Sequence, residues 1–155
     1  MRLRFSAPWS TPLTLISTLM VVIVAGAWFS GATLAVVLLL AVLALAAALS
    51  VRGYVVEPDA VVVLRLGWAT RLPLEGLESV EAEPEAMRRA LRTFGIGGPF
   101  AFVGRYRTAS LGDFTAYATS RPHAVVLRWP ERTVVVTPDD PDTFVAAVEA
   151  AVAEA

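Results

Sequence analysis

The stretch from Thr93 to Arg107, TFGIGGPFAFVGRYR, combines glycine and arginine, two residue types that commonly contact phosphate. A Walker loop would end in Gly-Lys-Ser or Gly-Lys-Thr, whereas residues 97–99 read GGP and offer neither the lysine nor the hydroxyl. A dinucleotide-binding fingerprint would need a third glycine where this chain has Phe100. Both nucleotide-binding motifs are therefore excluded. We expect a loop that leads into the next strand, with positive φ angles at Gly95, Gly97 and Gly98.

Five arginines around this stretch are the candidate binding residues: Arg88, Arg89, Arg92, Arg105 and Arg107. The first three occupy neighbouring positions of one expected short helix or loop insertion. The last two share one face of an expected strand, because side chains on a strand repeat every two residues. If all five converge, they form a basic patch that binds anionic lipid or a protein partner. Each arginine then contributes about 1 kcal/mol against an anionic leaflet.

Surface ion pairing is the alternative role for these arginines. Glu81, Glu83 and Glu85 precede them closely in the sequence and could neutralise them on a solvated face. Exposed ion pairs of this kind contribute little to stability. The two roles differ in whether the guanidinium groups stay available to a ligand.

No arrangement of residues predicts catalysis. The chain has no cysteine and a single histidine, His123, which follows Pro122 where a turn is expected. Asp139, Asp140 and Asp142 lack the glycine and the distal glutamate of a calcium loop, and helix capping explains them better. We therefore expect no catalytic residues, no cofactor and no metal, and we interpret the protein as a non-enzyme.

Residues 51–155 predict a small α+β or mainly-β domain. Short β-branched runs are separated by turn sequences such as EPD at 57–59, and further strand candidates follow in close succession. The chain then ends in an amphipathic helix, with Asp140 as its N-cap and Pro141 as its first residue. About seven antiparallel strands capped by a C-terminal helix is the element order of a pleckstrin-homology-like (PH-like) domain.

Three motifs resemble one known family. They are GIGG at 95–98, GRYRTASLGDFTAYATSR at 104–121 and VVVTPDDPDTFVAAV at 134–148. In these motifs the sequence is similar to bacterial PH-like domain membrane proteins, small members with two transmembrane helices. The resemblance implies a PH-like domain after a transmembrane hairpin, and such members generally have no assigned activity.

The segment from Leu13 to Ser50 is uncharged and strongly apolar, which raises the mean hydropathy of the chain to +0.63. A single helix of this length would measure about 57 Å, nearly twice the roughly 30 Å hydrocarbon core of a bilayer. Gly26, Ser30 and Gly31 weaken the helix near its middle. The segment therefore predicts a transmembrane α-hairpin of two helices, over 13–28 and 32–50. A cleaved signal peptide is the competing interpretation, but signal cores span only about 7–15 apolar residues.

Arginines at both ends of this segment predict its orientation. Arg2 and Arg4 precede it, Arg52 follows it, and the connecting turn carries no charge. The positive-inside rule then places both termini in the cytoplasm, as in a multi-pass protein of the inner (plasma) membrane. The expected organisation is a cytoplasmic N-terminal segment at 1–12, the hairpin at 13–50 and a cytoplasmic PH-like domain at 51–155.

The expected function is that of a binding module anchored in the membrane. It would bind a protein or peptide partner, or an anionic lipid surface, at the cytoplasmic face. Residues 51–155 carry 11 arginines and 14 acidic residues, so their formal charge is 11 − 14 = −3 and nucleic acid is not an expected partner. The alternative is an accessory subunit of a larger membrane complex, with the hairpin as the interface. The sequence leaves the oligomeric state open.

Overall fold

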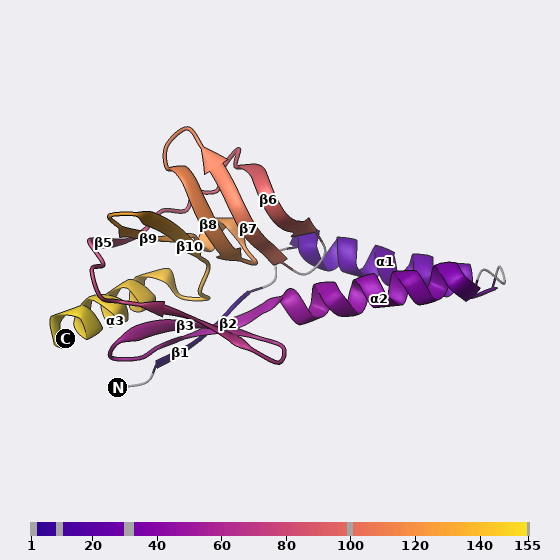
Figure 1. Ribbon diagram of the computed structural model, residues 1–155, viewed down its shortest axis with the longest axis horizontal. Coiled ribbons are helices and arrows are strands. Elements are labelled where there is room, and N and C mark those ends of the chain that lie inside the picture. The colour runs from indigo at the N-terminus through magenta and orange to yellow at the C-terminus, as the bar shows by residue number, and fades with distance from the viewer. Residues whose placement is uncertain (1–2, 9–10, 30–32, 99–100, 155) are drawn as a thin grey trace.

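The computed structural model describes residues 3–8, 11–29, 33–98 and 101–154 (Figure 1). The N-terminal elements are β1 (Leu3–Ser6), α1 (Thr11–Phe29), α2 (Thr33–Leu49), β2 (Val51–Val56), β3 (Ala60–Arg65) and β4 (Ala69–Pro73). The elements that follow are β5 (Ser79–Ala82), β6 (Leu91–Gly98), β7 (Ala101–Thr108), β8 (Gly112–Ala118), a 3-10 turn (Arg121–His123), β9 (Val125–Trp129), β10 (Arg132–Val136) and α3 (Pro141–Glu154).

The strands form two sheets. The first has the order β1-β2-β3-β4 and is antiparallel throughout. The second has the order β5-β9-β10-β8-β7-β6, and all of its pairs are antiparallel except β8 with β10. Turn chemistry fixes the connections in the first sheet. The Glu57 N–H donates to the Ala60 carbonyl at 2.8 Å, and Gly67 adopts a φ of 94° between β3 and β4.

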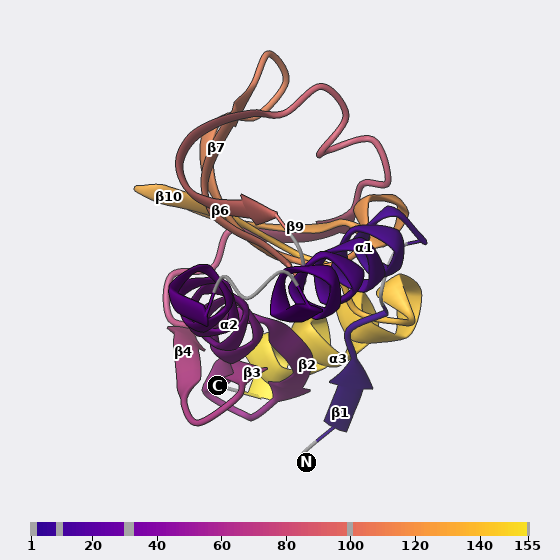
Figure 2. The same ribbon diagram turned by 90° about the vertical axis from the view of Figure 1, so that its right-hand side faces the viewer.

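The main hydrophobic core lies where the two sheets and α3 meet. Both views place α3 between the sheets (Figures 1 and 2). Phe144 and Val148 are fully buried on its inner face, and they pack with Tyr54 and Val61 of the first sheet and Leu127 of the second. A second cluster lies on the opposite face of the six-stranded sheet, beneath the turns that follow β5.

The expected N-cap of α3 is confirmed. The Asp140 carboxylate accepts a hydrogen bond from the Thr143 N–H at 3.1 Å and another from the Thr143 hydroxyl at 2.6 Å. These bonds hold the pKa of Asp140 below its ordinary value, with the Thr143 hydroxyl as the larger cause. The expected turn at His123 is also confirmed, because this residue ends the 3-10 turn and its Nδ1 lies 2.9 Å from the Ser120 hydroxyl.

Strand β1 binds the domain closely, although the sequence predicted only an N-terminal segment there. The Phe5 ring meets the Phe144 ring edge-on at a centroid distance of 5.2 Å. Gly53 makes this approach possible, since a Cβ at that position would lie 2.6 Å from the Phe5 carbonyl oxygen. The Ser6 N–H donates to the Asp139 carboxylate at 3.1 Å. Residues on both sides of the apolar helices therefore contribute to one core.

The transmembrane hairpin expected at 13–28 and 32–50 is wrong. Two helices do lie side by side near these positions and extend away from the sheets (Figure 1). They contain 19 and 17 described residues. Among the described residues, no helix has both the length and the apolar character needed to cross a membrane. The multi-pass placement with both termini in the cytoplasm rested on these spans and is wrong with them.

The expected strand count and the expected glycine loop also need correction. Among the described residues from Val51 to Val136 there are nine strands, one pair of them parallel, where about seven antiparallel strands were expected. Gly95, Gly97 and Gly98 belong to β6 and pair with β7 instead of forming a loop. Glycine has no side chain to show the two-residue period of a strand, so the sequence pattern resembled a turn.

Candidate functional site

Strand β7 presents two of the candidate arginines on one face. Arg105 and Arg107 are exposed, whereas Tyr106 between them is buried and stacks on Phe114 of the neighbouring strand β8. Burial raises the pKa of Tyr106 above its ordinary value. The alternation fixes the direction of both arginines, because the buried tyrosine holds the strand in register.

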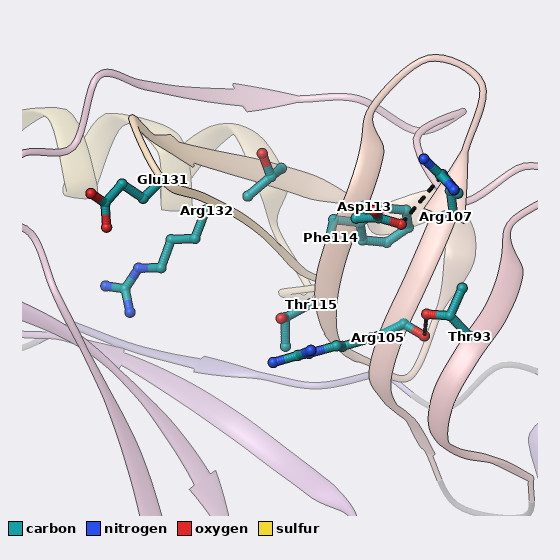
Figure 3. Close-up of a pocket in the computed structure, with 9 residues that line it drawn as sticks. Thr93, Arg105, Arg107, Asp113, Phe114, Thr115, Glu131 and Arg132 are labelled. Carbon is teal, nitrogen blue, oxygen red and sulfur yellow. Dashed lines mark hydrogen bonds and ion pairs between the residues drawn. The ribbon is translucent and has the colours of Figure 1, made fainter.

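Arg105 and Arg107 line an open hollow of about 490 Å³, which we call the sheet-face hollow. Its lining residues are Thr93, Arg105, Arg107, Asp113, Phe114, Thr115, Glu131, Arg132 and Thr133. Arg105 of β7 and Arg132 of β10 extend into the same space from different strands (Figure 3). The Arg107 Nε lies 3.4 Å from the Asp113 carboxylate, in an exposed ion pair. Arg132 is positioned by stacking at 4.4 Å over the Trp129 ring.

A second open hollow of about 450 Å³ shares Arg107 and is called here the arginine hollow. Its lining residues are Arg88, Arg89, Leu91, Arg107, Thr108, Ala109 and Ser110. The Thr108 hydroxyl accepts a hydrogen bond from the Leu111 N–H at 3.1 Å and lies 3.3 Å from the Ser110 hydroxyl. Three arginines and Ser110 therefore line one space, and guanidinium and hydroxyl groups are donors that bind an oxyanion.

Arg89 has an unusual backbone conformation at this hollow. Its φ is 56°, the left-handed region that costs most residues about 1–2 kcal/mol, and it is the one non-glycine residue with positive φ in the described part of the chain. Its side chain is exposed and forms no ion pair with any described residue. A strained and unpaired arginine in a hollow is the kind of outlier that functional sites retain.

The structure brings four of the five predicted arginines around these two hollows. Arg88, Arg89 and Arg107 line the arginine hollow, and Arg105 joins Arg107 in the sheet-face hollow. Arg92 lines neither of them. The single short helix expected over Arg88, Arg89 and Arg92 does not form, because residues 84–89 are turns and Arg92 belongs to β6, where pairing with β7 prevails over helix propensity.

One of these arginines forms an ion pair with one of the three glutamates expected, which is the alternative role. Arg88 pairs with Glu85 at 2.8 Å, which raises the pKa of Arg88 above its ordinary value. Glu81 and Glu83 instead pair with Arg128 of β9. Two of the three glutamates are thereby directed to another strand, and they leave the hollows without their charge.

The charge around the two hollows is positive. Five arginines, Arg88, Arg89, Arg105, Arg107 and Arg132, face three carboxylates, Glu85, Asp113 and Glu131, so the formal sum is 5 − 3 = +2. Arg132 and Ser110 were not predicted as site residues. Only the strand order brings Arg132 of β10 near β7, with β8 between the two strands, whereas Ser110 follows β7 directly in the chain. Over the described ranges, no cluster of three His, Asp or Glu side chains could hold a metal ion.

A β-rich domain of two sheets with a C-terminal helix is the architecture of the PH-like class. The sequence matches the family described as bacterial PH domain over residues 52–152, which is more than half of the chain. The protein therefore belongs to the bacterial PH domain family, whose PH-like domains are generally non-catalytic binding modules. No curated protein and no solved structure matches the chain.

Proposed function

We propose that this protein is a non-enzymatic binding module for phosphate-bearing anions, and that its ligand is the anionic headgroup surface of a lipid layer. Residues 51–155 form the binding domain in this proposal, and β1 completes its core. The observation that carries the proposal is the shared position of Arg107 between two adjoining hollows. Through it, five arginines line two adjoining hollows in a chain whose net charge is −1.

The chemistry of the two hollows supports a phosphate ligand. A guanidinium group donates two parallel hydrogen bonds to a phosphate, and hydroxyl donors such as Ser110 complete the coordination. Arg89 and Arg105 have no carboxylate partner among the described residues and need no rearrangement. Arg107 must leave Asp113, but a pair at 3.4 Å with both side chains about two-thirds exposed contributes little.

Vesicle binding by the full-length chain tests the proposal. Binding is measured by co-sedimentation with neutral phosphatidylcholine vesicles and with vesicles containing one quarter phosphatidylglycerol. The apolar helices contribute to both measurements, so the ratio of the two affinities isolates the contribution of charge. Replacing Arg105 and Arg107 together by glutamate removes two contacts of about 1 kcal/mol each and should lower this ratio about thirtyfold.

Arg52→Glu is the matched control for the vesicle experiment. Arg52 is exposed on β2, in the other sheet, and lines neither hollow. The affinity ratio of the Arg52→Glu variant should stay within about twofold of the ratio for the original protein. An equal fall of this affinity ratio in both variants, or no fall in the double variant, would reject the hollows as the binding site. Glycerol phosphate is added as a competitor. If the hollows bind single headgroups, this soluble anion displaces the protein from the vesicles. If they bind only an extended lipid surface, it does not.

A second candidate function is that of a subunit in a larger protein complex with α1 and α2 as its interface. Large apolar side chains on both helices are exposed, among them Leu15, Leu19, Phe29, Leu38 and Leu45. Exposed apolar surface of this extent marks a site that another apolar surface covers. Light scattering in a mild detergent tests this candidate, and a monomer at all concentrations would count against it.

A further inference from the structure

Strand β5 leaves one edge of the six-stranded sheet open. It pairs with β9 on one side, and within the described ranges no strand pairs with the other. The Glu83 N–H donates to the Ala124 carbonyl at 2.8 Å, which fixes the alternation of amides along the strand. Val80 and Ala82 therefore direct their N–H and C=O groups away from β9. Such an edge can accept the backbone of another extended chain.

A groove runs between this edge and the last turns of α3, with a volume of about 380 Å³. Its lining residues are Leu77, Glu78, Ser79, Val80, Glu81, Glu149, Val152 and Ala153. Five of them, residues 77–81, are consecutive, so the groove follows the chain into the first three residues of β5. Apolar side chains come from both walls, and Val152 remains 39% exposed although it extends the inner face of α3. The groove thus offers an apolar wall beside unpaired backbone groups.

The rim of the groove is acidic. Glu78 and Glu149 are exposed and have no ion-pair partner in the described part of the chain. Glu81 and Glu83 share the single guanidinium of Arg128, which leaves an excess of one negative charge on that group. The formal sum of four glutamates and one arginine is therefore −4 + 1 = −3. An occupant of this groove must be cationic to match it.

We infer that this groove binds an extended, cationic segment of a partner protein, which adds a strand to β5. Alternate apolar side chains of the segment enter the groove between β5 and α3. The basic side chains between them meet the glutamates of the rim. This surface is separate from the arginine-lined hollows and requires the opposite charge in its ligand, so the inference does not depend on the proposed function.

A synthetic peptide tests this inference with the full-length chain in a mild non-ionic detergent. The probe is a fluorescent, end-blocked hexapeptide that alternates valine and arginine, and binding is followed by fluorescence anisotropy. We expect binding of this probe and no binding of the peptide that alternates valine and glutamate. Changing Glu78 and Glu149 together to arginine should weaken binding about tenfold or more. Equal binding of both peptides, or no binding of the basic one, overturns the inference.

Glu85→Arg is the matched control for charge. Glu85 is exposed and adjoins the turn residues that pack on the opposite face of the six-stranded sheet, and it does not line the groove. This variant should bind the probe within about twofold of the original protein. A loss equal to that of the double variant would show that only overall charge matters and would reject the groove.

Two N-methylated probes test the strand addition itself. One carries methyl groups on its valine amides and the other on its arginine amides, so charge and side chains are unchanged. In a strand, these two sets of amides face opposite edges. One probe should lose at least about tenfold in affinity and the other should bind like its parent. Loss by both probes, or by neither, rejects backbone pairing with β5.

Discussion

We predict that replacing Tyr54 by phenylalanine destabilises the protein by about 1–3 kcal/mol at neutral pH. The Tyr54 hydroxyl donates to the Tyr117 carbonyl at 2.5 Å and accepts from the Thr137 N–H at 3.1 Å. Tyr54 belongs to the first sheet, whereas its partners lie in β8 and just after β10 of the second. Its side chain is fully buried, so phenylalanine removes both hydrogen bonds and puts no polar atom in the place of the hydroxyl.

The pH dependence gives the same prediction a second readout. Burial raises the pKa of Tyr54 from 10.0 to about 12, so the folded state holds this proton more tightly than the unfolded chain. The contribution is complete below pH 10 and is lost as the pH rises from 10 to about 12. A shift of about two pKa units, at roughly 1.4 kcal/mol each, amounts to about 3 kcal/mol. The phenylalanine variant lacks this loss, so its stability should fall less steeply over that interval.

The composition of the chain makes this interval unusually easy to interpret. All thirteen basic residues are arginine, and there is no cysteine, so no lysine or cysteine side chain titrates between pH 9 and 12. The assay is urea unfolding in a mild detergent at several pH values, followed by tryptophan fluorescence. Tyr117→Phe is the control, because it retains the backbone carbonyl that Tyr54 uses. A Tyr54→Phe cost below about 0.5 kcal/mol, with the same slope as the original protein between pH 10 and 12, would refute the reasoning.

Two further substitutions test the close pairing of β1 with β2 and the backbone strain of Arg89 at the arginine hollow. Gly53→Ala places a Cβ 2.6 Å from the Phe5 carbonyl oxygen and should cost about 1–3 kcal/mol in urea unfolding, whereas Gly26→Ala on α1, with no atom within 4 Å of its added Cβ, should cost nothing. Arg89→Gly should raise stability by about 0.5–1 kcal/mol, because glycine tolerates a φ of 56°, while it weakens binding to anionic vesicles. A variant of Arg89 that gains stability and retains full vesicle binding would separate this residue from the site.

The parts of the fold that the sequence predicts are those coded locally. The cap of α3 follows from Asp140 and Pro141, and the β-branched runs on either side of the 57–59 turn become β2 and β3. Strand β1 was missed because its signal is not local. Four residues of alternating type become a strand only through Gly53, which lies beyond both apolar helices in the sequence and lets the backbone approach. The glycine-rich strand β6 was missed for the related reason that its partner β7, and not its own side chains, makes it a strand.

The candidate site was predictable only where one strand carries it. The spacing of Arg105 and Arg107 fixed their common face, since the two-residue period holds in any sheet. Arg132 joins them because β10 lies next to β8, a parallel pairing between strands with the 3-10 turn and β9 between them in the sequence. The turn that brings Arg88 and Arg89 to Arg107 is equally a product of tertiary packing, with Met87 buried against the sheet as its anchor.

The net charge of the domain does not show how its positive and negative side chains are distributed. A formal charge of −3 for residues 51–155 indicated no general attraction to nucleic acid, yet the charges are segregated within one sheet. The arginine-lined hollows sum to +2 toward the β6–β7 side, and the groove along β5 sums to −3 at the opposite edge. The two proposed ligands, which are opposite in charge, would therefore not compete for a residue. A domain that holds an anionic surface at one edge of a sheet and a cationic peptide at the other would join the two, which is a physical basis for an adaptor without any catalytic group.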